Sequence, residues 1–506
     1  MKIFKALFIL IPIIVAALVM NSCHKEQFST KGALSFSTDT LTFDTVFTTL
    51  GSTTKYFKVR NTQSKSLNVS SIKLMQLEGT QFRINVDGIS GTEFKNVDIP
   101  AHDSIYVFVE VTINPNSANN PFVIFDQVQF VTNGVTQNVV LEAMGQNAYY
   151  HFSEHITNAT PPWQSDKPHI IVNRNGGLPI LAIDTGVTFN IPAKCQIYMG
   201  PNAVITVDGT LNAHGGDWGD SIVFQYIRHD YQNKPGQWLG ITYSRIGKID
   251  MDHVVIDQST FGISDEYVLD LIAKSQITTS DLRNYGSDPN IPKVTLDKCI
   301  IRNCSSSALT AIRTKLVATN CLMHTSGGNM IVCAAGGTYD ITNCTFANIY
   351  NQYTSHQNPS LLISEQIAYI DNQFVLGPYP TVANIFNTAI TGNLNNEVAV
   401  VSPSNAVTAS FQYCNLSMDK DTFHVIQSAD NGCKFNFNPS AYTFFVDVQS
   451  NNYMPDSTIS PLTDSGSAAL QPNPSVDLFD QPRSTSPSPN NGTPPFHSIG
   501  AIEWHQ

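Results

Sequence analysis

The chain reads Ala318-Thr319-Asn320-Cys321-Leu322-Met323 within a six-residue pattern that occurs four times. The other copies are Met251-Asp252-His253-Val254-Val255-Ile256, Leu296-Asp297-Lys298-Cys299-Ile300-Ile301 and Ile341-Thr342-Asn343-Cys344-Thr345-Phe346. Their fourth positions are 254, 299, 321 and 344, so the later copies are 22 and 23 residues apart and the first step of 45 residues equals two such units. A fixed period of this length indicates a solenoid.

The repeated unit has the pattern of a β-strand that buries one face. Apolar and polar residues alternate in it, and Asn or Gly stands at the expected corners. One unit of this length predicts one coil of a parallel β-helix, whose strands hydrogen-bond to the coils above and below. Leucine-rich repeats have a similar length but need a repeated Leu and Asn framework that is absent here. We therefore predict a β-helix over residues 165–455.

The same period predicts a column of cysteines. Cys299, Cys321 and Cys344 share one coil position, and Cys414 follows in a later coil. In-register strands hold their Cβ vectors parallel, so we expect free inward thiols about 4.8 Å apart rather than disulfides. The cysteines expected outside the column are Cys195, Cys304, Cys333 and Cys433. An oxidising envelope would permit one disulfide among them. We expect no metal site, because the sequence lacks the paired Cys-x-x-Cys spacing with His that such a site needs.

Two groups of segments resemble right-handed parallel β-helix proteins of the pectin-lyase-like superfamily. The opening coils are matched by GVTFNIP at 186–192, GPNAVITVDGTLNA at 200–213 and GQWLGI at 236–241. The closing segment is matched by SPLTDSG at 460–466, DQPR at 480–483 and IGAIE at 499–503, with Ser498 where an Asp is usual. The resemblance covers about residues 165–506 and implies a C-terminal cap over 456–506. It also implies a polysaccharide-rich setting, since many relatives cleave or bind acidic glycans and others are adhesins.

Residues 30–147 predict a separate β-sandwich, and residues 148–164 a linker. Ile105, Val107, Val109 and Val111 alternate with polar or aromatic residues, and Asn133-Gly134 suits a tight hairpin. Roughly seven to nine strands in this length favour an immunoglobulin-like sandwich. Four short motifs are Thr45-Val46 before Gly51, Val59-Arg60-Asn61, Ile99-Pro100-Ala101 and the segment 141–145. They resemble bacterial immunoglobulin-like modules akin to those of ciliary and centrosomal proteins, which implies a spacer or binding module. The predicted fold class is all-β: an N-terminal immunoglobulin-like β-sandwich followed by a right-handed parallel β-helix.

The N-terminus predicts export. Lys2 and Lys5 precede an apolar run over 6–20 that is too short for an ordinary membrane span. The run ends at Met20-Asn21-Ser22-Cys23, which resembles the lipobox of Bacteroidetes-type lipoproteins with Met in place of the usual Leu. The resemblance implies a signal peptide over 1–22, lipidation of Cys23, an anchor linker over 23–29 and attachment to the outer membrane, facing the periplasm or the exterior. Ordinary signal cleavage is the alternative.

Composition restricts the partners. The formal net charge is −12 and only 13% of residues are charged, so the chain offers no basic footprint for nucleic acid. Hydrophobic residues make up 42%, which excludes a chain that is disordered throughout. The expected partners are polysaccharide or a cell-surface protein, and the membrane is reached through the lipid anchor only.

Two groups of residues are candidates for a site. A stretch that mixes aromatic and charged side chains suits glycan contact, with a structural role for the tryptophan as the alternative. Its members are Arg228, His229, Tyr231, Trp238, Tyr243 and Arg245, with Lys234 among them. Arg302 and His324 occupy one outward coil position in adjacent layers, either as weak catalytic candidates or as two solvated side chains.

The sequence favours binding over catalysis. It has no Asn-Thr-Asp, Asp-Asp or Gly-His-Gly triplet in the repeats, although inverting hydrolases of this fold need clustered carboxylates. We therefore expect a lipid-anchored envelope protein whose β-helix presents a rigid surface for glycan or protein, without a cofactor. The alternative is a polysaccharide lyase or glycoside hydrolase acting on acidic polysaccharide, and a lyase would need Ca²⁺ or another cation.

Overall fold

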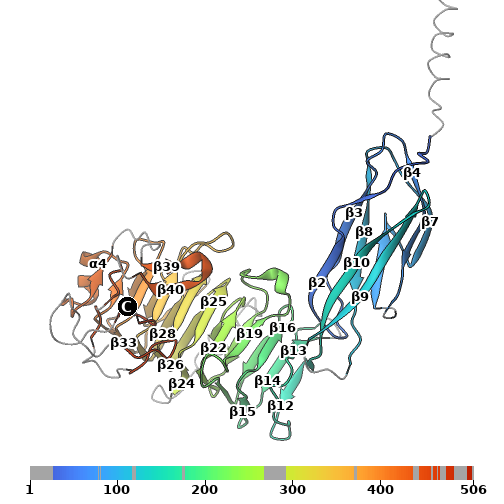
Figure 1. The fold of residues 1–506 in the computed structure, drawn as a ribbon. Helices are drawn as coiled ribbons and strands as arrows, with labels where there is room; N and C mark the ends of the chain where they lie inside the picture. Colours follow the sequence, from blue (N-terminus) through green and yellow to red (C-terminus); the bar gives the residue numbers. More distant parts are fainter. Residues whose placement is uncertain are drawn as a thin grey trace, which may run out of the picture. The chain divides into compact units, whose positions relative to one another are not determined.

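The computed structural model describes residues 27–77, 79, 81–116, 121–173, 177–266, 292–369, 373–436, 444–456, 460–463, 465–467, 474–483 and 498–503 (Figure 1). Cys23 and the predicted signal peptide lie outside these residues. Within the described ranges, no helix has the length and apolar character needed to cross a membrane. The chain divides into two compact units between Ala148 and Tyr149.

Unit 1 is a sandwich of two sheets. The first has the order β1 (Ser35–Phe36), β3 (Lys55–Arg60), β8 (Ser104–Val111), β5 (Phe82–Val86) and β6 (Ile89–Gly91). The second has the order β2 (Thr40–Phe47), β10 (Val135–Gln146), β9 (Phe122–Thr132), β4 (Leu67–Leu74) and β7 (Glu93–Ile99). Their pairs are antiparallel except for β10 with β2.

The predicted alternation builds the core of this sandwich. Ile105, Val107, Val109 and Val111 of β8 are all buried, in one hydrophobic cluster with residues of both sheets. The turn Asn133-Gly134 joins β9 to β10 with φ values of 51° and 77°, the left-handed conformation that a two-residue hairpin requires. The sandwich is therefore confirmed, with one face of each sheet inside and the other at the surface.

Unit 2 is a solenoid of parallel strands, which lie side by side from coil to coil in Figure 1. One sheet, here the eleven-strand sheet, has the order β11 (Tyr149–Phe152), β13 (His169–Val172), β16 (Gln196–Met199), β19 (Ile222–Tyr226), β22 (Val254–Asp257), β25 (Ile300–Cys304), β27 (Leu322–Ser326), β29 (Thr345–Asn348), β34 (Ala389–Gly392), β37 (Asn415–Leu416) and β38 (Lys434–Phe435). Its strand pairs are parallel throughout.

A second sheet, here the wrapped sheet, forms the other two sides of the coils. One branch contains β12 (Glu154–Ile156), β14 (Ile180–Ile183), β17 (Val204–Val207), β20 (Gly240–Tyr243) and β23 (Ile263–Asp265), and the other contains β15 (Thr188–Ile191), β18 (Thr210–His214), β21 (Lys248–Asp252) and β24 (Pro292–Asp297). The branches join on the long bent strands β26 (Leu309–Thr319) and β28 (Ile331–Thr342), followed by β30 (Leu361–Ser364), β33 (Thr381–Phe386), β35 (Val398–Val401) and β36 (Val407–Gln412). The predicted β-helix is thus confirmed.

The β-helix begins earlier than predicted. β11 and β12 lie inside the predicted linker over 148–164, yet they pair in parallel with β13 and β14 of the next coil. Strands of three or four residues are too short to show a period in the sequence, so the linker prediction was wrong there.

The cysteine column is longer than predicted. Strand register in the eleven-strand sheet places nine residues at one coil position: Cys195, Ile222, Val254, Cys299, Cys321, Cys344, Thr388, Cys414 and Cys433. The prediction that Cys195 and Cys433 lie outside the column was wrong, because loops of unequal length between coils hide the period at its two ends. Cys304 and Cys333 are buried elsewhere in the core, and all eight cysteines after Cys23 are free thiols.

The column follows a tight backbone corner. Each of Lys298, Asn320 and Asn343 has a φ near 50° immediately before a column cysteine. The thiol that follows donates to the carbonyl oxygen two residues earlier, at 3.3 Å for Cys299, 3.2 Å for Cys321 and 3.4 Å for Cys344. Thr388 makes the same bond with its hydroxyl, at 2.8 Å. In these coils the column position carries a small side chain that donates a hydrogen bond to the corner, which Cys and Thr both provide, whereas Ile222 and Val254 fill it in two earlier coils without a donor.

Trp163 lies at the N-terminal end of the solenoid core, over two histidines. Its ring stacks on His169 at 3.9 Å and on His151 at 4.3 Å between ring centroids. His169 Nε2 lies 2.7 Å from the Gln164 carbonyl oxygen, so its proton is on Nε2, and its Nδ1 accepts from His151 Nε2 at 2.9 Å. Glu154 lies 2.6 Å from the other nitrogen of His151. Burial lowers the pKa of His169 to about 4.

At the C-terminal end, helix α4 (Lys420–Ile426) covers the last coils. Its Phe423 is fully buried and contacts the rings of Phe411 and Phe435. The described parts of the predicted cap, 456–506, lie elsewhere: Leu462, Leu478 and Ile499 pack on the outer face of the eleven-strand sheet, beside β27, β29 and β34. They therefore extend along the flank of the coils and do not close their end.

We expect the eight buried cysteines to resist alkylation. Burial raises the pKa of Cys195 and of Cys304 to about 12, so these two thiols carry almost no thiolate near pH 8. The other six are shielded from the reagent because their side chains are buried. In a protein of residues 24–506, iodoacetamide should label none of the eight in buffer and all of them in guanidinium, as read by intact mass. The variant Ser64→Cys, with its thiol at an exposed position, should label fully in buffer. Rapid native labelling of the wild type would contradict the buried column.

We expect the stability of unit 2 to fall as the pH drops from about 6.5 to about 4. His169 is neutral when folded and takes up a proton at about pH 6.5 when unfolded, so protonation of the unfolded chain removes about 3 kcal/mol over this window. All four tryptophans follow residue 148, so denaturant unfolding read by tryptophan fluorescence reports on unit 2. The variant His169→Gln should show a weaker decline over the same window, and an identical decline in both proteins would sink the assignment.

Candidate functional site

Two of the predicted contact residues are not at the surface. Trp238 and Tyr243 are both 0% exposed in the core of the solenoid. The Trp238 indole donates to the Asp257 carbonyl oxygen at 2.7 Å. The Tyr243 hydroxyl donates to the Thr310 carbonyl oxygen at 3.5 Å. The prediction that they contact a ligand was therefore wrong, because their rings fill the coil interior.

The rest of that stretch separates into two places. Tyr231 ends the short helix η1 (His229–Tyr231), and its ring lies between Arg228 and Lys234, each with its charged group 4.4 Å from the ring centroid. Arg228 also pairs with Asp230 at 2.7 Å, which lowers the pKa of that carboxyl. The structure describes only the backbone of His229, the first residue of η1. Arg245 stands at another corner of the coil, in the turn after β20.

Arg302 and His324 are neighbours, as predicted. They are register partners on β25 and β27. His324 is only 1% exposed because the Tyr453 ring covers it at 4.4 Å, so it is not a solvated side chain, and burial holds its pKa well below the usual range. Arg302 Nε and Asn303 Nδ2 each donate to the Asp257 carboxylate at 2.8 Å.

A cleft of about 310 Å³, here the polar cleft, is lined by chain neighbours of both groups, and none of the predicted site residues is among its described lining residues. Its walls are Asn233 in the loop after η1, the ends of β25 and β27, the loop after β29, and the segment formed by η4 (Val448–Ser450) and β40 (Asn452–Pro455). The lining residues are Asn233, Asn303, Thr325, Ile349, Tyr350, Asn351, Gln352, Tyr353, Val448, Gln449, Asn451 and Tyr453. Asn303 directly follows Arg302, and Thr325 directly follows His324.

The lining of the polar cleft is uncharged and rich in amides. Six Asn and Gln side chains supply both donors and acceptors, and the rings of Tyr350 and Tyr353 are 37% and 43% exposed. Carboxylates are not among its described lining residues. Amides with exposed phenol rings can bind hydroxyl groups and cover a flat apolar ring face at the same time.

Hydrogen bonds hold the loop that carries Tyr350 and Tyr353 in one conformation. Asn351 Oδ1 accepts from the backbone N–H groups of Tyr353 and Thr354, both at 2.8 Å. The Tyr350 hydroxyl donates to the His356 carbonyl oxygen at 3.0 Å. His356 contacts the buried Glu397 carboxylate at 3.0 Å, and this carboxylate also accepts from the Leu394 N–H. The rings are therefore held in place before any ligand arrives.

The sequence analysis missed this loop. Tyr350-Asn351-Gln352-Tyr353 follows the fourth repeat copy directly, and it mixes aromatic and planar polar residues as the 228–245 stretch does. The same criterion would have found it. The contribution of Gln449 and Asn451 had no such signal, because only the fold of the C-terminal segment brings them to the cleft.

A buried ion pair holds the C-terminal segment beside the cleft. Arg483 pairs with Glu503 at 3.3 Å, and both side chains are buried. Arg483 also donates to Asn320 Oδ1 at 2.8 Å. Ser498 has no carboxylate to pair with Arg483, and Glu503 supplies one instead. The Ser498 backbone N–H also donates to the Glu503 carboxylate at 2.9 Å. Across the residues that the structure describes, no group of three or more His, Cys, Asp or Glu side chains is arranged to hold a metal ion.

No family model and no curated protein matches this chain. Among solved structures, the catalytic unit of a GH87 alpha-1,3-glucanase from Streptomyces thermodiastaticus is 10% identical over 72% of this chain and 84% of that one, with a TM-score of 0.23. The PapD-like domain 7 of human CEP192 is 11% identical over 24% and 91%, with a TM-score of 0.17. A family 123 glycoside hydrolase from Clostridium perfringens is 7% identical, with a TM-score of 0.17, and the match covers 23% of this chain and 30% of that protein. Scores this low carry no argument, so the fold rests on the strand register.

We expect Arg483→Met to destabilise unit 2 by about 3–5 kcal/mol, because it leaves the Glu503 carboxylate buried without its cation. The matched control is Lys194→Met, which removes an exposed cation 2.9 Å from Asp220 and should change the stability far less, because water screens this pair. Denaturant unfolding followed by tryptophan fluorescence measures both. Equal losses in the two variants would contradict the anchoring role of Arg483.

Proposed function

We propose that this protein binds polysaccharide at the cell envelope, with the polar cleft as the binding site for neutral sugar residues. The observation that carries the proposal is the lining itself, in which two exposed tyrosine rings stand among six amide side chains on a rigid coil. Sugar rings present apolar faces to aromatic groups and hydroxyls to amides. The volume of about 310 Å³ is at the lower end of the range for ligand pockets.

The sequence supports the location. We propose that Cys23 carries the lipid and that residues 1–22 are removed, so that the mature chain is attached to the outer membrane by its N-terminus. A polysaccharide is a repeating polymer of the envelope, and a lipid-anchored chain meets it without a membrane-spanning segment. The lipobox resemblance supports this assignment independently of the cleft.

One observation favours hydrolysis as a second candidate function. Asp252 and Asp297 are register partners on β21 and β24. Burial raises the pKa of Asp297 to about 6, whereas the pKa of Asp252 is lowered because hydrogen bonds from His253, Gly216 and His214 outweigh its burial. Two carboxyl groups with pKa values driven apart suit a general acid and its partner.

We expect the double variant Tyr350→Ala, Tyr353→Ala to bind neutral polysaccharide about thirtyfold more weakly than the wild type, because each ring contributes about 1 kcal/mol of stacking. Isothermal titration of residues 24–506 with soluble glucan, mannan and xylan measures the affinities.

The matched control for this experiment is Tyr379→Ala. This tyrosine packs under Arg313 at 4.2 Å and is not among the lining residues of the cleft, so the affinity should be unchanged. The proposal would be contradicted if the wild type bound none of the three polymers, or if the control variant lost as much affinity as the double variant. New reducing ends that disappear in Asp297→Asn would show hydrolysis instead.

A further inference from the structure

The outer face of the first sheet of unit 1 carries a patch of aromatic and charged side chains. In register, Tyr56 of β3 lies opposite Phe108 of β8, and Lys58 opposite Tyr106. The three rings contact one another with centroids 5.4 to 5.9 Å apart. Tyr56 is 54% exposed and Tyr106 is 37% exposed. Rings this exposed on a soluble β-sheet indicate a surface for contact.

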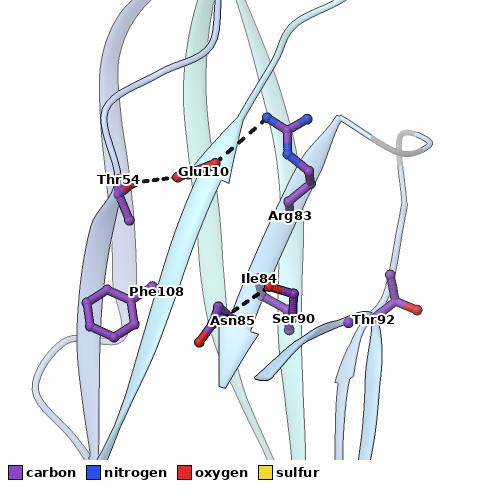
Figure 2. Close-up of a pocket in the computed structure, with 9 residues that line it drawn as sticks. Thr54, Arg83, Ile84, Asn85, Ser90, Thr92, Phe108 and Glu110 are labelled. Atoms are coloured by element: carbon purple, nitrogen blue, oxygen red, sulfur yellow. Dashed lines mark hydrogen bonds and ion pairs between the residues drawn. The ribbon is translucent and has the colours of Figure 1, made fainter. Parts of the chain in front are cut away.

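A wide hollow of about 810 Å³ adjoins these rings. Figure 2 shows its upper row, in which Glu110 lies between Thr54 and Arg83, and its lower row of Phe108, Asn85 and Ser90. Glu110 accepts from Thr54 Oγ1 at 2.5 Å, whereas its distance to the Arg83 guanidinium is 3.9 Å. The Arg83 side chain is 55% exposed, so most of its donors face solvent. Asn85 donates to Ser90 Oγ at 3.1 Å.

Cations stand at both ends of the rings. Arg83 borders the hollow, and Lys58 and Arg60 line a second hollow of about 420 Å³ on the same sheet. The carboxylates beside these two hollows are Glu110 and Asp103. Among the residues that line these two hollows, three cations therefore stand against two carboxylates, although the whole chain has 40 acidic and 28 basic residues. β3 alone extends the face over about 20 Å, enough for several sugar residues of a linear polymer.

We infer that this face of unit 1 is a binding site for an acidic polysaccharide, one whose sugar rings carry carboxylate groups. The rings of Tyr56, Tyr106 and Phe108 stack on sugar faces, and Arg83, Lys58 and Arg60 pair with the carboxylates. A neutral glycan would leave the cations without an anionic partner. An anionic polymer without flat sugar faces would leave the aromatic rings without a stacking partner. The inference does not depend on the polar cleft, which belongs to unit 2 and has an uncharged lining.

The test compares two forms of one polymer, polygalacturonate and its methyl ester, by titration into residues 24–506. The ester keeps the sugar rings and removes their charge. We expect the wild type to bind polygalacturonate at least tenfold more tightly than the ester, with an affinity that falls as salt rises.

Two double variants separate the contributions of charge and ring. Lys58→Gln, Arg83→Gln should weaken binding of polygalacturonate at least fivefold and leave binding of the ester unchanged. Tyr56→Ala, Tyr106→Ala should weaken binding of both forms at least fivefold. Because these side chains are at the surface, circular dichroism should show unchanged folding in both variants.

Two controls distinguish this site from others. Lys73→Gln, Lys95→Gln removes two exposed cations from the second sheet of the sandwich and should leave the affinity unchanged. The cleft variant Tyr350→Ala, Tyr353→Ala should also bind polygalacturonate normally. The function proposed for the polar cleft can therefore fail while this inference stands, and this inference can fail while the function of the cleft stands. Absence of binding to polygalacturonate, equal affinity for the ester, or an equal loss in the Lys73 and Lys95 control would overturn the inference.

Discussion

The solenoid depends on one backbone corner that is repeated from coil to coil. A residue in the left-handed conformation turns the chain into the eleven-strand sheet, and the next side chain donates a hydrogen bond back to the corner carbonyl. Such a conformation costs about 1 kcal/mol or more for most residues and least for Asn and Gly. A small donor such as Cys or Thr at the next position avoids the penalty of a buried carbonyl without a partner, although Ile222 and Val254 cannot supply this bond in their coils.

The same corners bind the C-terminal segment. Asn320 and Asn387 adopt positive φ, and their amides then face outward, where they bond the returning chain: Asn320 accepts from Arg483, and Asn387 exchanges two bonds with Ser467. One residue type therefore satisfies the backbone and the tertiary contact together. This pairing explains how a segment with little regular structure covers the outer face of the eleven-strand sheet.

The fold could be predicted because the repeat makes the same physical demand every 22 or 23 residues. The alternation of β8 and the hairpin at Asn133-Gly134 likewise follow from local rules. Errors arose where local signals end: the spacing of Cys195 and Cys433 is hidden by loops of unequal length, and β11 and β12 are too short to show a period. For the site, composition grouped Tyr231, which is partly buried against the solenoid core, with the fully buried Trp238. It could not separate the two rings, because the role of an aromatic side chain depends on which side of the coil it occupies.

The polar cleft also illustrates why a coil with loops suits the recognition of a polymer. Loop side chains usually lose conformational freedom when they bind, at about 0.5–1.5 kcal/mol for each one immobilised. Here the cost is reduced in advance, since Asn351 folds the loop back on itself and the buried Glu397 holds its base through His356. Glu397 can remain buried because several donors compensate its charge, including the Ser360 hydroxyl at 2.7 Å. The stability of the coil core thus fixes the positions of the amides and phenols that line the polar cleft.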